Sequence, residues 1–417
     1  MSKTSPARSW SLLRSSLFLL LLLHPALAEQ LADGTELHLR LLDPISSATS
    51  RPKDPVHAVL IAPIVSPDRT LVPAGAEING EVREVLASSA AGNDTKQARL
   101  LLAFNHLHLS GTQPLPIAGK LTSIDNARET VDPDGRIVGI DPTQTLASQA
   151  ERGINKLSER FGSLGSILEA AKGAIVKPTD PEINYPAGVE FTVALLKPLT
   201  LPPEFLSVAA KAAPALGSFN AADLQRMVAD QPVRANAAKP PRPSDLTNVL
   251  LIGTEENITA AFTNAGWSPA AALNEETKLE TARAIIENRG YKEGPVSLLY
   301  LDGRPPGIVL EKTNDTFDAR HHLRIWRRPG TFNGLPIWIM TATHDTAIQF
   351  SETDHTFIHK IDPNIDLERA KVVSDLLFTG AVHSIALVER TGLPQNPTNA
   401  TGDELITDGR IAVLQID

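Results

Sequence analysis

The alternation of apolar and polar residues divides the chain beyond residue 28 into a strand-rich first half and a mixed second half. Leu37-His38-Leu39-Arg40-Leu41 alternates strictly, which predicts a half-buried β-strand, and residues 191–196 form an apolar run typical of a buried strand. Further strands are expected in the same region, at 56–65, 78–87, 98–109 and 115–124. Several short strands separated by turns predict a small β-barrel or sandwich.

A short phrase with glycine at its third position precedes a predicted strand three times in this region. The copies are Ala32-Asp33-Gly34-Thr35-Glu36-Leu37, Pro73-Ala74-Gly75-Ala76-Glu77-Ile78 and Pro186-Ala187-Gly188-Val189-Glu190-Phe191. Because glycine adopts positive φ angles that other residues resist, each phrase predicts a tight turn that leads directly into a strand.

Residues 143–176 have a different pattern, with apolar side chains three and four positions apart, which predicts an amphipathic helix of roughly 30 residues. Four glycines lower its intrinsic stability, by about 1 kcal/mol each relative to alanine: Gly153, Gly162, Gly165 and Gly173. The helix therefore needs a partner surface. It is expected to pack on the β-rich domain, and self-association or membrane contact are the alternatives.

Proline and alanine dominate residues 201–245, which favours an extended, semi-rigid linker with one short helix at 221–231. The sequence thus predicts a β-rich domain at 29–200 and a second domain at 246–417. In the second domain, strands are expected at 248–253, 296–302, 306–312, 321–328, 336–349, 382–389 and 410–416, and helices at 255–266, 275–289 and 365–378. Mixed helices and neighbouring strands predict an α+β fold.

The first 28 residues have the composition of a signal peptide. Lys3, Arg8 and Arg14 precede the apolar run Leu17–Leu23, and Ala26-Leu27-Ala28 provides a cleavage site. An uncleaved anchor is the alternative, but the apolar run is shorter than the roughly 20 residues that span a bilayer. We expect export to the periplasm or cell envelope, with no transmembrane span after cleavage.

Composition narrows the chemistry of the mature chain. Without the three basic residues of the signal, 36 basic residues face 48 acidic ones, which argues against nucleic acid as a partner. The absence of cysteine excludes disulfides, thiolate metal sites and cysteine nucleophiles. No phosphate-binding loop, dinucleotide fingerprint or G-x-S-x-G motif is present, so no cofactor is predicted.

Histidines are concentrated in the second domain. Six of the eleven lie within about 60 residues: His321, His322, His344, His355, His359 and His383. A metal site there would need histidine and carboxylate ligands, but the segment between His355 and His359 favours a β-strand, which would hold the two too far apart to share an ion. Whether a metal binds remains open at this point.

Strand phase places His322, Arg324, Trp326 and Arg328 on one face, opposite His321. Such a stripe can receive an anion or a sugar, because arginine offers paired donors and tryptophan a stacking surface. The alternative is a solvent-exposed face whose charges pair with nearby carboxylates, which are Asp362, Asp366 and Glu368.

Several blocks of residues 245–417 resemble the LssY C-terminal domain family. They are Val296-Ser297-Leu298-Leu299-Tyr300-Leu301-Asp302-Gly303-Arg304, His321-His322-Leu323-Arg324-Ile325-Trp326, Trp338 with Thr343-His344-Asp345, His359-Lys360-Ile361-Asp362-Pro363-Asn364-Ile365-Asp366-Leu367-Glu368-Arg369, and Thr407-Asp408-Gly409-Arg410. The resemblance implies one constellation of candidate residues, catalytic or structural: His322, Arg324, Trp326, Asp345, His359, Asp362, Asp366, Glu368 and Arg369. In some proteins this domain is appended to a type 2 phosphatidic acid phosphatase, whose P-S-G-H motif is absent here.

A weaker resemblance concerns residues 31–200. The phrase Pro73-Ala74-Gly75-Ala76-Glu77-Ile78-Asn79-Gly80 is similar to a strand turn in the β-barrel of TrbI-type secretion channel proteins, a barrel that carries inserted helices. Two functions follow as hypotheses. The first is a binding or assembly module whose partners are envelope proteins or an anionic or sugar ligand. The second is a periplasmic hydrolase of a phosphate- or sugar-containing envelope component, acting through the histidine, aspartate and arginine cluster.

Overall fold

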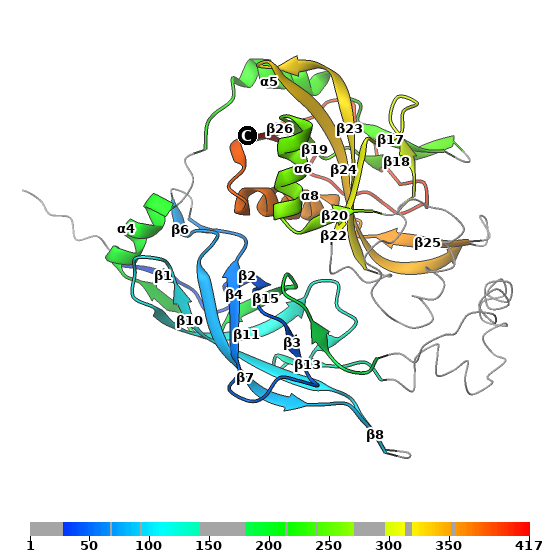
Figure 1. The fold of residues 1–417 in the computed structure, drawn as a ribbon. Coiled ribbons are helices and arrows are strands. Elements are labelled where there is room, and N and C mark those ends of the chain that lie inside the picture. The colour runs from blue at the N-terminus through cyan, green and yellow to red at the C-terminus, as the bar shows by residue number, and fades with distance from the viewer. Residues whose placement is uncertain are drawn as a thin grey trace, which may run out of the picture.

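The computed structural model describes residues 28–66, 69–91, 94–141, 180–212, 216–238, 241–270, 297–312, 319–351 and 356–417. Within them the chain forms a β-barrel followed by a mixed α+β domain, and the two lie against each other (Figure 1). The predicted α+β class is confirmed. The signal peptide and the expected helices at 143–176 and 275–289 lie outside the described residues, apart from Ala28.

Six strands close the N-terminal barrel in the order β11-β15-β2-β4-β7-β10, because β10 also pairs with β11. Their bounds are Glu36–Leu41 (β2), Pro55–Leu60 (β4), Glu77–Leu86 (β7), Arg99–His108 (β10), Leu115–Ile124 (β11) and Glu190–Leu195 (β15). Short pairs surround the barrel: β1 (Glu29–Leu31) with β16 (Leu199–Leu201), β3 (Ile45–Ser46) with β14 (Asn184–Tyr185), β5 (Ile64–Val65) with β6 (Thr70–Val72), β8 (Ser89–Ala91) with β9 (Asp94–Lys96), and β12 (Thr130–Val131) with β13 (Arg136–Val138).

The alternating strand predicted at 37–41 contributes its apolar side chains to the barrel core. Leu37, Leu39 and Leu41 are all buried, as a strand with one face in the core requires. Arg40, on the face expected to meet solvent, is buried as well. The second domain covers this face at Arg40, as its contacts show below, whereas Glu36 and His38 on the same face are exposed.

The three repeated turns adopt the predicted conformation. Gly34, Gly75 and Gly188 have φ angles of 76°, 88° and 100°. Each of their amides donates a hydrogen bond to a carbonyl of a neighbouring strand, Leu195, Leu60 and Leu41 respectively, at 2.7–2.8 Å. The repeated phrase therefore starts three strands of one barrel in the same way.

The C-terminal domain is built on a sheet of order β20-β22-β23-β24-β19-β27-β26, with β25 paired to β24. The only parallel pair in this described sheet is β19 with β27. The strands are β19 (Val249–Ile252), β20 (Trp267–Pro269), β22 (Ile308–Lys312), β23 (Arg320–Phe332), β24 (Leu335–Ser351), β25 (Thr356–Ile361), β26 (Val382–Glu389) and β27 (Arg410–Ile416).

Helices cover both faces of this sheet. On one face, α6 (Glu255–Asn264) and α8 (Ile365–Phe378) share a core with Leu251 and Ile325. On the other, α5 (Ala221–Ala229) packs with a small sheet. Figure 1 shows α8 on the side of the sheet that faces the barrel. No helix among the described residues is long and apolar enough to cross a membrane.

The proline-rich stretch at 201–245 differs from the expected extended linker. It contains α4 (Pro203–Ala212), α5, and the strands β17 (Arg234–Ala238) and β18 (Pro241–Leu246), which form a three-stranded sheet with β21 (Leu299–Tyr300). The prolines lie where such elements tolerate them. Pro203 is the first residue of α4, and Pro241 and Pro243 lie in β18, an edge strand of that sheet.

Candidate functional site

Strand β23 separates the candidate residues onto two faces. His322, Arg324 and Trp326 share one face with Asp345 of β24, as strand phase predicts. Asp345 is the centre of this group: its carboxylate lies 3.3 Å from Arg320 Nε, 3.5 Å from His322 Nδ1 and 3.2 Å from His359 Nδ1. We name these four residues the Asp345 cluster.

Burial controls the electrostatics of the Asp345 cluster. It raises the pKa of Asp345 to about 6, although the nearby guanidinium groups of Arg320 and Arg324 oppose the shift. Burial also holds the pKa of His322 well below its usual value, and repulsion by Arg324 and Arg320 adds to this effect. His322 is therefore neutral at pH 7, and its Nε2 lies 2.9 Å from Thr343 Oγ1.

Arg324 and Trp326 are buried and satisfied by the protein itself. Arg324 Nη1 lies 3.2 Å from Asp245, and its Nε donates to the Ser297 carbonyl at 2.8 Å. Trp326 Nε1 donates to the Arg304 carbonyl at 3.1 Å. Arg328, the second arginine of the stripe, lies 2.9 Å from Asp302. The stripe is thus not a solvent-exposed face whose arginines pair with Asp362, Asp366 or Glu368.

Three other candidates connect elements instead of joining this cluster. Arg369 Nη1 contacts Asp366 at 2.8 Å and Asp408 at 2.9 Å. These bonds attach the first turn of α8 to the start of β27. The Asp362 carboxylate accepts the Asn364 amide just before α8, at 2.9 Å. The geometry gives these residues a positioning role in the fold.

Glu368 lies on the opposite side of β23, where the barrel meets the C-terminal domain. Its carboxylate contacts His321 Nδ1 at 2.7 Å, and His321 Nε2 lies 3.0 Å from both oxygens of Asp125, just beyond β11. The neighbouring His344 Nε2 lies 2.8 Å from Asn126 Oδ1. Two adjacent barrel residues thus meet two paired histidines.

The charges at this contact support one another. Burial alone would raise the pKa of Asp125, but the positive charge and hydrogen bond of His321 lower it to about 2. Burial alone would lower the pKa of His321, yet attraction from Asp125 and Glu368 raises it well above its usual value. His321 is therefore an imidazolium held between two carboxylates.

A second set of buried charges joins the domains beside this contact. Arg40 and Glu190 of the barrel meet Lys312, Lys371 and Asp375 of the C-terminal domain, and we name these five residues the interface network. Glu190 lies 2.7 Å from Arg40 and 3.0 Å from Lys312, and it also contacts the Lys371 ammonium. Asp375 lies 2.9 Å from Lys312 and 3.3 Å from Lys371.

Further bonds saturate the interface network. Trp267 Nε1 donates to Asp375 at 2.9 Å, and the Ala265 carbonyl accepts from both Arg40 and Lys312. Burial alone would raise the pKa of Glu190, but Lys371, Lys312 and Arg40 hold it well below its usual value. Burial alone would lower the pKa of Lys371, but Asp375 and Glu190 raise it well above its usual value. Glu190 and Lys371 therefore both carry their charge at neutral pH.

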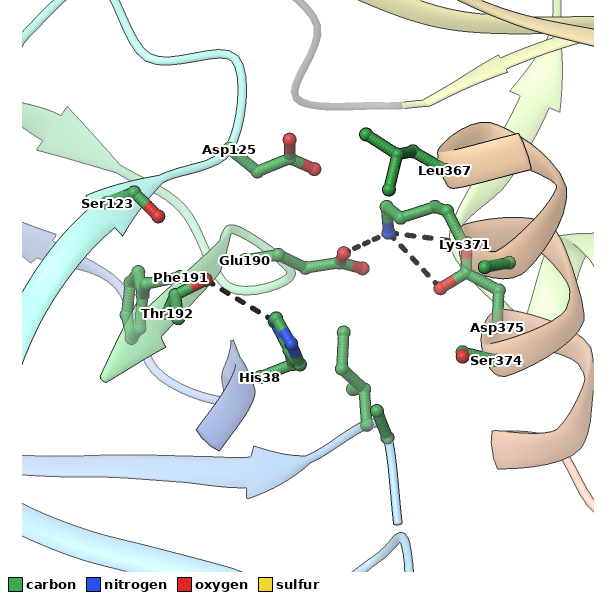
Figure 2. Close-up of a pocket in the computed structure, with 13 residues that line it drawn as sticks. His38, Ser123, Asp125, Glu190, Phe191, Thr192, Leu367, Lys371, Ser374 and Asp375 are labelled. Atoms are coloured by element: carbon green, nitrogen blue, oxygen red, sulfur yellow. Dashed lines mark hydrogen bonds and ion pairs between the residues drawn. The ribbon is translucent and has the colours of Figure 1, made fainter. Parts of the chain in front are cut away.

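A cavity of about 330 Å³ lies directly beside this network, between the two domains (Figure 2). In Figure 2, Lys371 and Leu367 reach in from α8, whereas Asp125 and His38 come from the barrel. The lining residues are His38, Ile61, Ala62, Ser123, Asp125, Glu190, Phe191, Thr192, Leu367, Ala370, Lys371, Ser374 and Asp375. Both domains are needed to form this interdomain pocket.

Sequence reasoning did not find the interface residues of the barrel. Arg40 occupies a polar position of an alternating strand, and Glu190 directly precedes an apolar run, so neither position is unusual in the sequence. Of the candidate constellation, only Glu368 reaches the interface, through His321. A single sequence does not show which residue of the barrel contacts which helix of the C-terminal domain.

One family model matches the C-terminal part of the chain. Residues 229–411 match the family model described as LssY C-terminus, which confirms the resemblance expected for the second domain and extends it to β17 and β18. Among solved structures, ComB10 of the Com type IV secretion system of Helicobacter pylori matches with 11% identity and a TM-score of 0.22, covering 41% of this chain and 89% of that chain. At this score the likeness supports no functional argument, and the barrel rests on its own strand pairing. No curated protein matches the chain.

Proposed function

We propose that this protein is an exported bacterial envelope protein in which the barrel and the LssY-like domain act together as one binding module. The ligand site of the proposal is the interdomain pocket. The observation that carries it is the interface network, which closes one side of that pocket with buried charges from both domains. The export part rests on the signal sequence.

The network supports a binding role because it fixes the relative orientation of the domains. A buried charge without a partner is strongly unfavourable, so alternative dockings that separate Glu190 from its three cations are disfavoured. A pocket built on such an interface keeps its shape before a ligand arrives. Preorganisation of this kind raises affinity, since less freedom is lost on binding.

The lining determines which ligand the pocket fits. Three of its residues are carboxylates, whereas Lys371 is the one lysine or arginine of the lining. Arg40, Lys312 and His321, which also pair with these carboxylates, lie outside the lining. Ser123, Thr192 and Ser374 add hydroxyl groups. We therefore expect a small polyhydroxylated or amine-bearing envelope component, such as an amino sugar, and weak binding of anions.

Ligand-observed NMR with the mature chain tests this proposal, using glucosamine, glucose and glucose 6-phosphate as probes. We expect binding in that order of affinity, because ammonium is attracted to Asp125 and Glu190 and phosphate is repelled.

Leu367 lies at the rim and is 58% exposed, so Leu367→Trp should obstruct the pocket and weaken glucosamine binding about tenfold, or roughly 1.4 kcal/mol.

Leu387→Trp is the matched control, because Leu387 is 46% exposed and belongs to β26, outside the pocket lining. It should leave binding unchanged. Absence of binding by all three sugars, or equal loss in both variants, contradicts the pocket as the ligand site.

The geometry of the Asp345 cluster favours a second candidate function, a hydrolase of an envelope component. His359, with 22% of its side chain exposed, places Nδ1 3.2 Å from Asp345, as in a general base paired with a carboxylate, and its Nε2 lies 3.4 Å from Arg320 Nη2. Asp362, another aspartate of the candidate constellation, accepts the Asn364 amide and does not join this cluster. Hydrolysis that His359→Ala abolishes and Leu367→Trp preserves would favour this candidate over the binding module.

A further inference from the structure

The contact of Asp125 and Asn126 with His321 and His344 has the composition of a metal site. Asp125, His321 and His344 each offer a ligand atom, and these atoms all lie within 4.8 Å of one another. His321 and His344 are directly paired across β23 and β24, so their rings extend side by side from the same face of the sheet. Asn126 Oδ1, next to His344 Nε2, is a fourth donor.

The chemistry of these donors selects a class of ion. Two imidazoles with carboxylate and amide oxygens suit first-row transition metals such as Zn²⁺, which bind four ligands of this kind. In a chain without cysteine, this is the kind of donor set from which a transition-metal site must be built.

Glu368 occupies the place of an outer-shell ligand. It contacts Nδ1 of His321, which leaves Nε2 directed at Asp125. Metal-binding histidines commonly have such a carboxylate on the second nitrogen, where it fixes the ring and increases its basicity. Glu368 is buried, and its Oε1 has no hydrogen-bond partner among the described residues, so its negative charge can offset that of a cation.

The Asp345 cluster, on the other face of the sheet, also combines histidines with a carboxylate, but its charge is unsuitable. Arg320 lies 3.3 Å from Asp345, and Arg324 is close enough to repel a further cation. At the domain contact the groups hydrogen-bonded to His321 are the carboxylates of Asp125 and Glu368. The nearby Lys371 ammonium is paired with Glu190 and Asp375. Electrostatics therefore favours the domain contact as the metal site.

We propose that a divalent transition metal of the zinc class binds between Asp125, Asn126, His321 and His344 and links the barrel to the C-terminal domain. The barrel supplies two oxygen ligands and the C-terminal domain two nitrogen ligands. The rings of His321 and His344 lie face to face, with centroids 4.2 Å apart, so both must tilt until their Nε2 atoms converge on the ion. The Nε2 proton of His321 leaves to solvent as the metal binds.

Isothermal titration of chelator-treated, untagged mature chain with ZnCl₂ tests the proposal. We expect one ion per chain and a rise in melting temperature, because the ion binds only the folded arrangement. His344→Ala should weaken zinc binding at least 100-fold, and Glu368→Gln should weaken it about 10- to 100-fold by removing the outer-shell partner. His344→Gln, which preserves more of the side-chain volume, provides a second ligand variant in case the alanine variant unfolds.

His383→Ala is the control, since His383 is 52% exposed and pairs with Asp417 away from the site. It should bind zinc like the unchanged chain. No binding at about 100 μM zinc, or equal binding by all variants that circular dichroism shows to be folded, overturns the proposal. Asp125 also lines the interdomain pocket, so the glucosamine test uses chelator-treated chain, and the two proposals then fail separately.

Discussion

Glu190 is the residue on which the contact between the two domains depends most. Its carboxylate meets Arg40, Lys312 and Lys371, and no member of this group can lose its partner without leaving a charge in a water-poor environment. Removal of one partner from a buried ion pair is strongly destabilising, whereas exposed pairs contribute little.

Glu190→Gln should lower the free energy of unfolding by about 3–5 kcal/mol, as measured by urea denaturation at pH 7. Because the three cations hold the pKa of Glu190 well below 4.5, its contribution is present above pH 4.5 and is lost as the pH falls towards the folded-state pKa. The variant should therefore lose less stability than the unchanged chain between pH 5 and the acid range.

Glu84→Gln is the matched control, since Glu84 pairs with Arg136 on the barrel surface and is 57% exposed. Its effect should stay within about 1 kcal/mol. Equal destabilisation by the two substitutions would show that the interface network does not stabilise the molecule.

Sequence periodicity predicts which residues share a face but not what covers that face. Strand phase correctly groups His322 with Arg324 and Trp326, because side chains alternate along any strand. The same reasoning predicts that Arg40 is exposed to solvent, yet its side chain is buried. Burial of a polar position depends on a contact between residues 335 positions apart, Arg40 and Asp375, which periodicity does not record.

At the scale of elements, most of the fold follows from the sequence. The strands at 115–124, 382–389 and 410–416 and the helix at 365–378 have the bounds that their patterns predict. The prediction of an extended linker at 201–245 was wrong, because it used the proline content of the segment and not the place of each proline within a helix or strand. Prolines are compatible with a first helical turn and with an edge strand, and those are the places where several of them lie.

The phrase that begins at Pro73 ends with a glycine whose role the structure explains. A Cβ atom on Gly80 of β7 would lie 2.0 Å from the carbonyl oxygen of Ala103 on β10. The two strands are paired there, next to an irregularity of register between Phe104 and His106. Close approach of the backbones, and not a positive φ angle, therefore requires glycine at this position.

Gly80→Ala should destabilise the barrel by at least roughly 1–3 kcal/mol, because the clash is with backbone and one strand must shift. Gly307→Ala is the control, since its Cβ would meet nothing within 4 Å. Thermal unfolding followed by circular dichroism distinguishes them. If both variants melt with the unchanged chain, the close approach of β7 and β10 is wrong.

At the scale of the whole molecule, six of the nine candidate residues divide into three groups with different tasks. His322, Asp345 and His359 belong to the Asp345 cluster, Asp366 and Arg369 attach α8 to the final strand, and Glu368 faces the barrel. These residues are close in sequence because β23, β24, β25 and α8 follow one another along the chain. The sequence pattern alone could not assign them to these groups, because the assignment depends on the face of the sheet toward which each side chain points.

Export is the whole-molecule property that the chain's first residues predict. Fusion of residues 1–28 to alkaline phosphatase, which becomes active only outside the bacterial cytoplasm, should give active enzyme. Leu20→Arg places a charge in the apolar run and should abolish that activity. An inactive fusion with the unchanged signal, at equal protein levels, contradicts the export prediction.

The pairing of β1 with β16 brings the two ends of the barrel together, with Glu29 opposite Leu201. The segment between those two residues therefore begins and ends at the same place in the molecule. A gene can therefore gain or lose the whole barrel at a single junction, but the C-terminal domain then loses the contacts of Lys312, Lys371 and Asp375 with Arg40 and Glu190. An N-terminal fusion partner that takes the barrel's place must therefore supply charges that replace those of Arg40 and Glu190 at this surface.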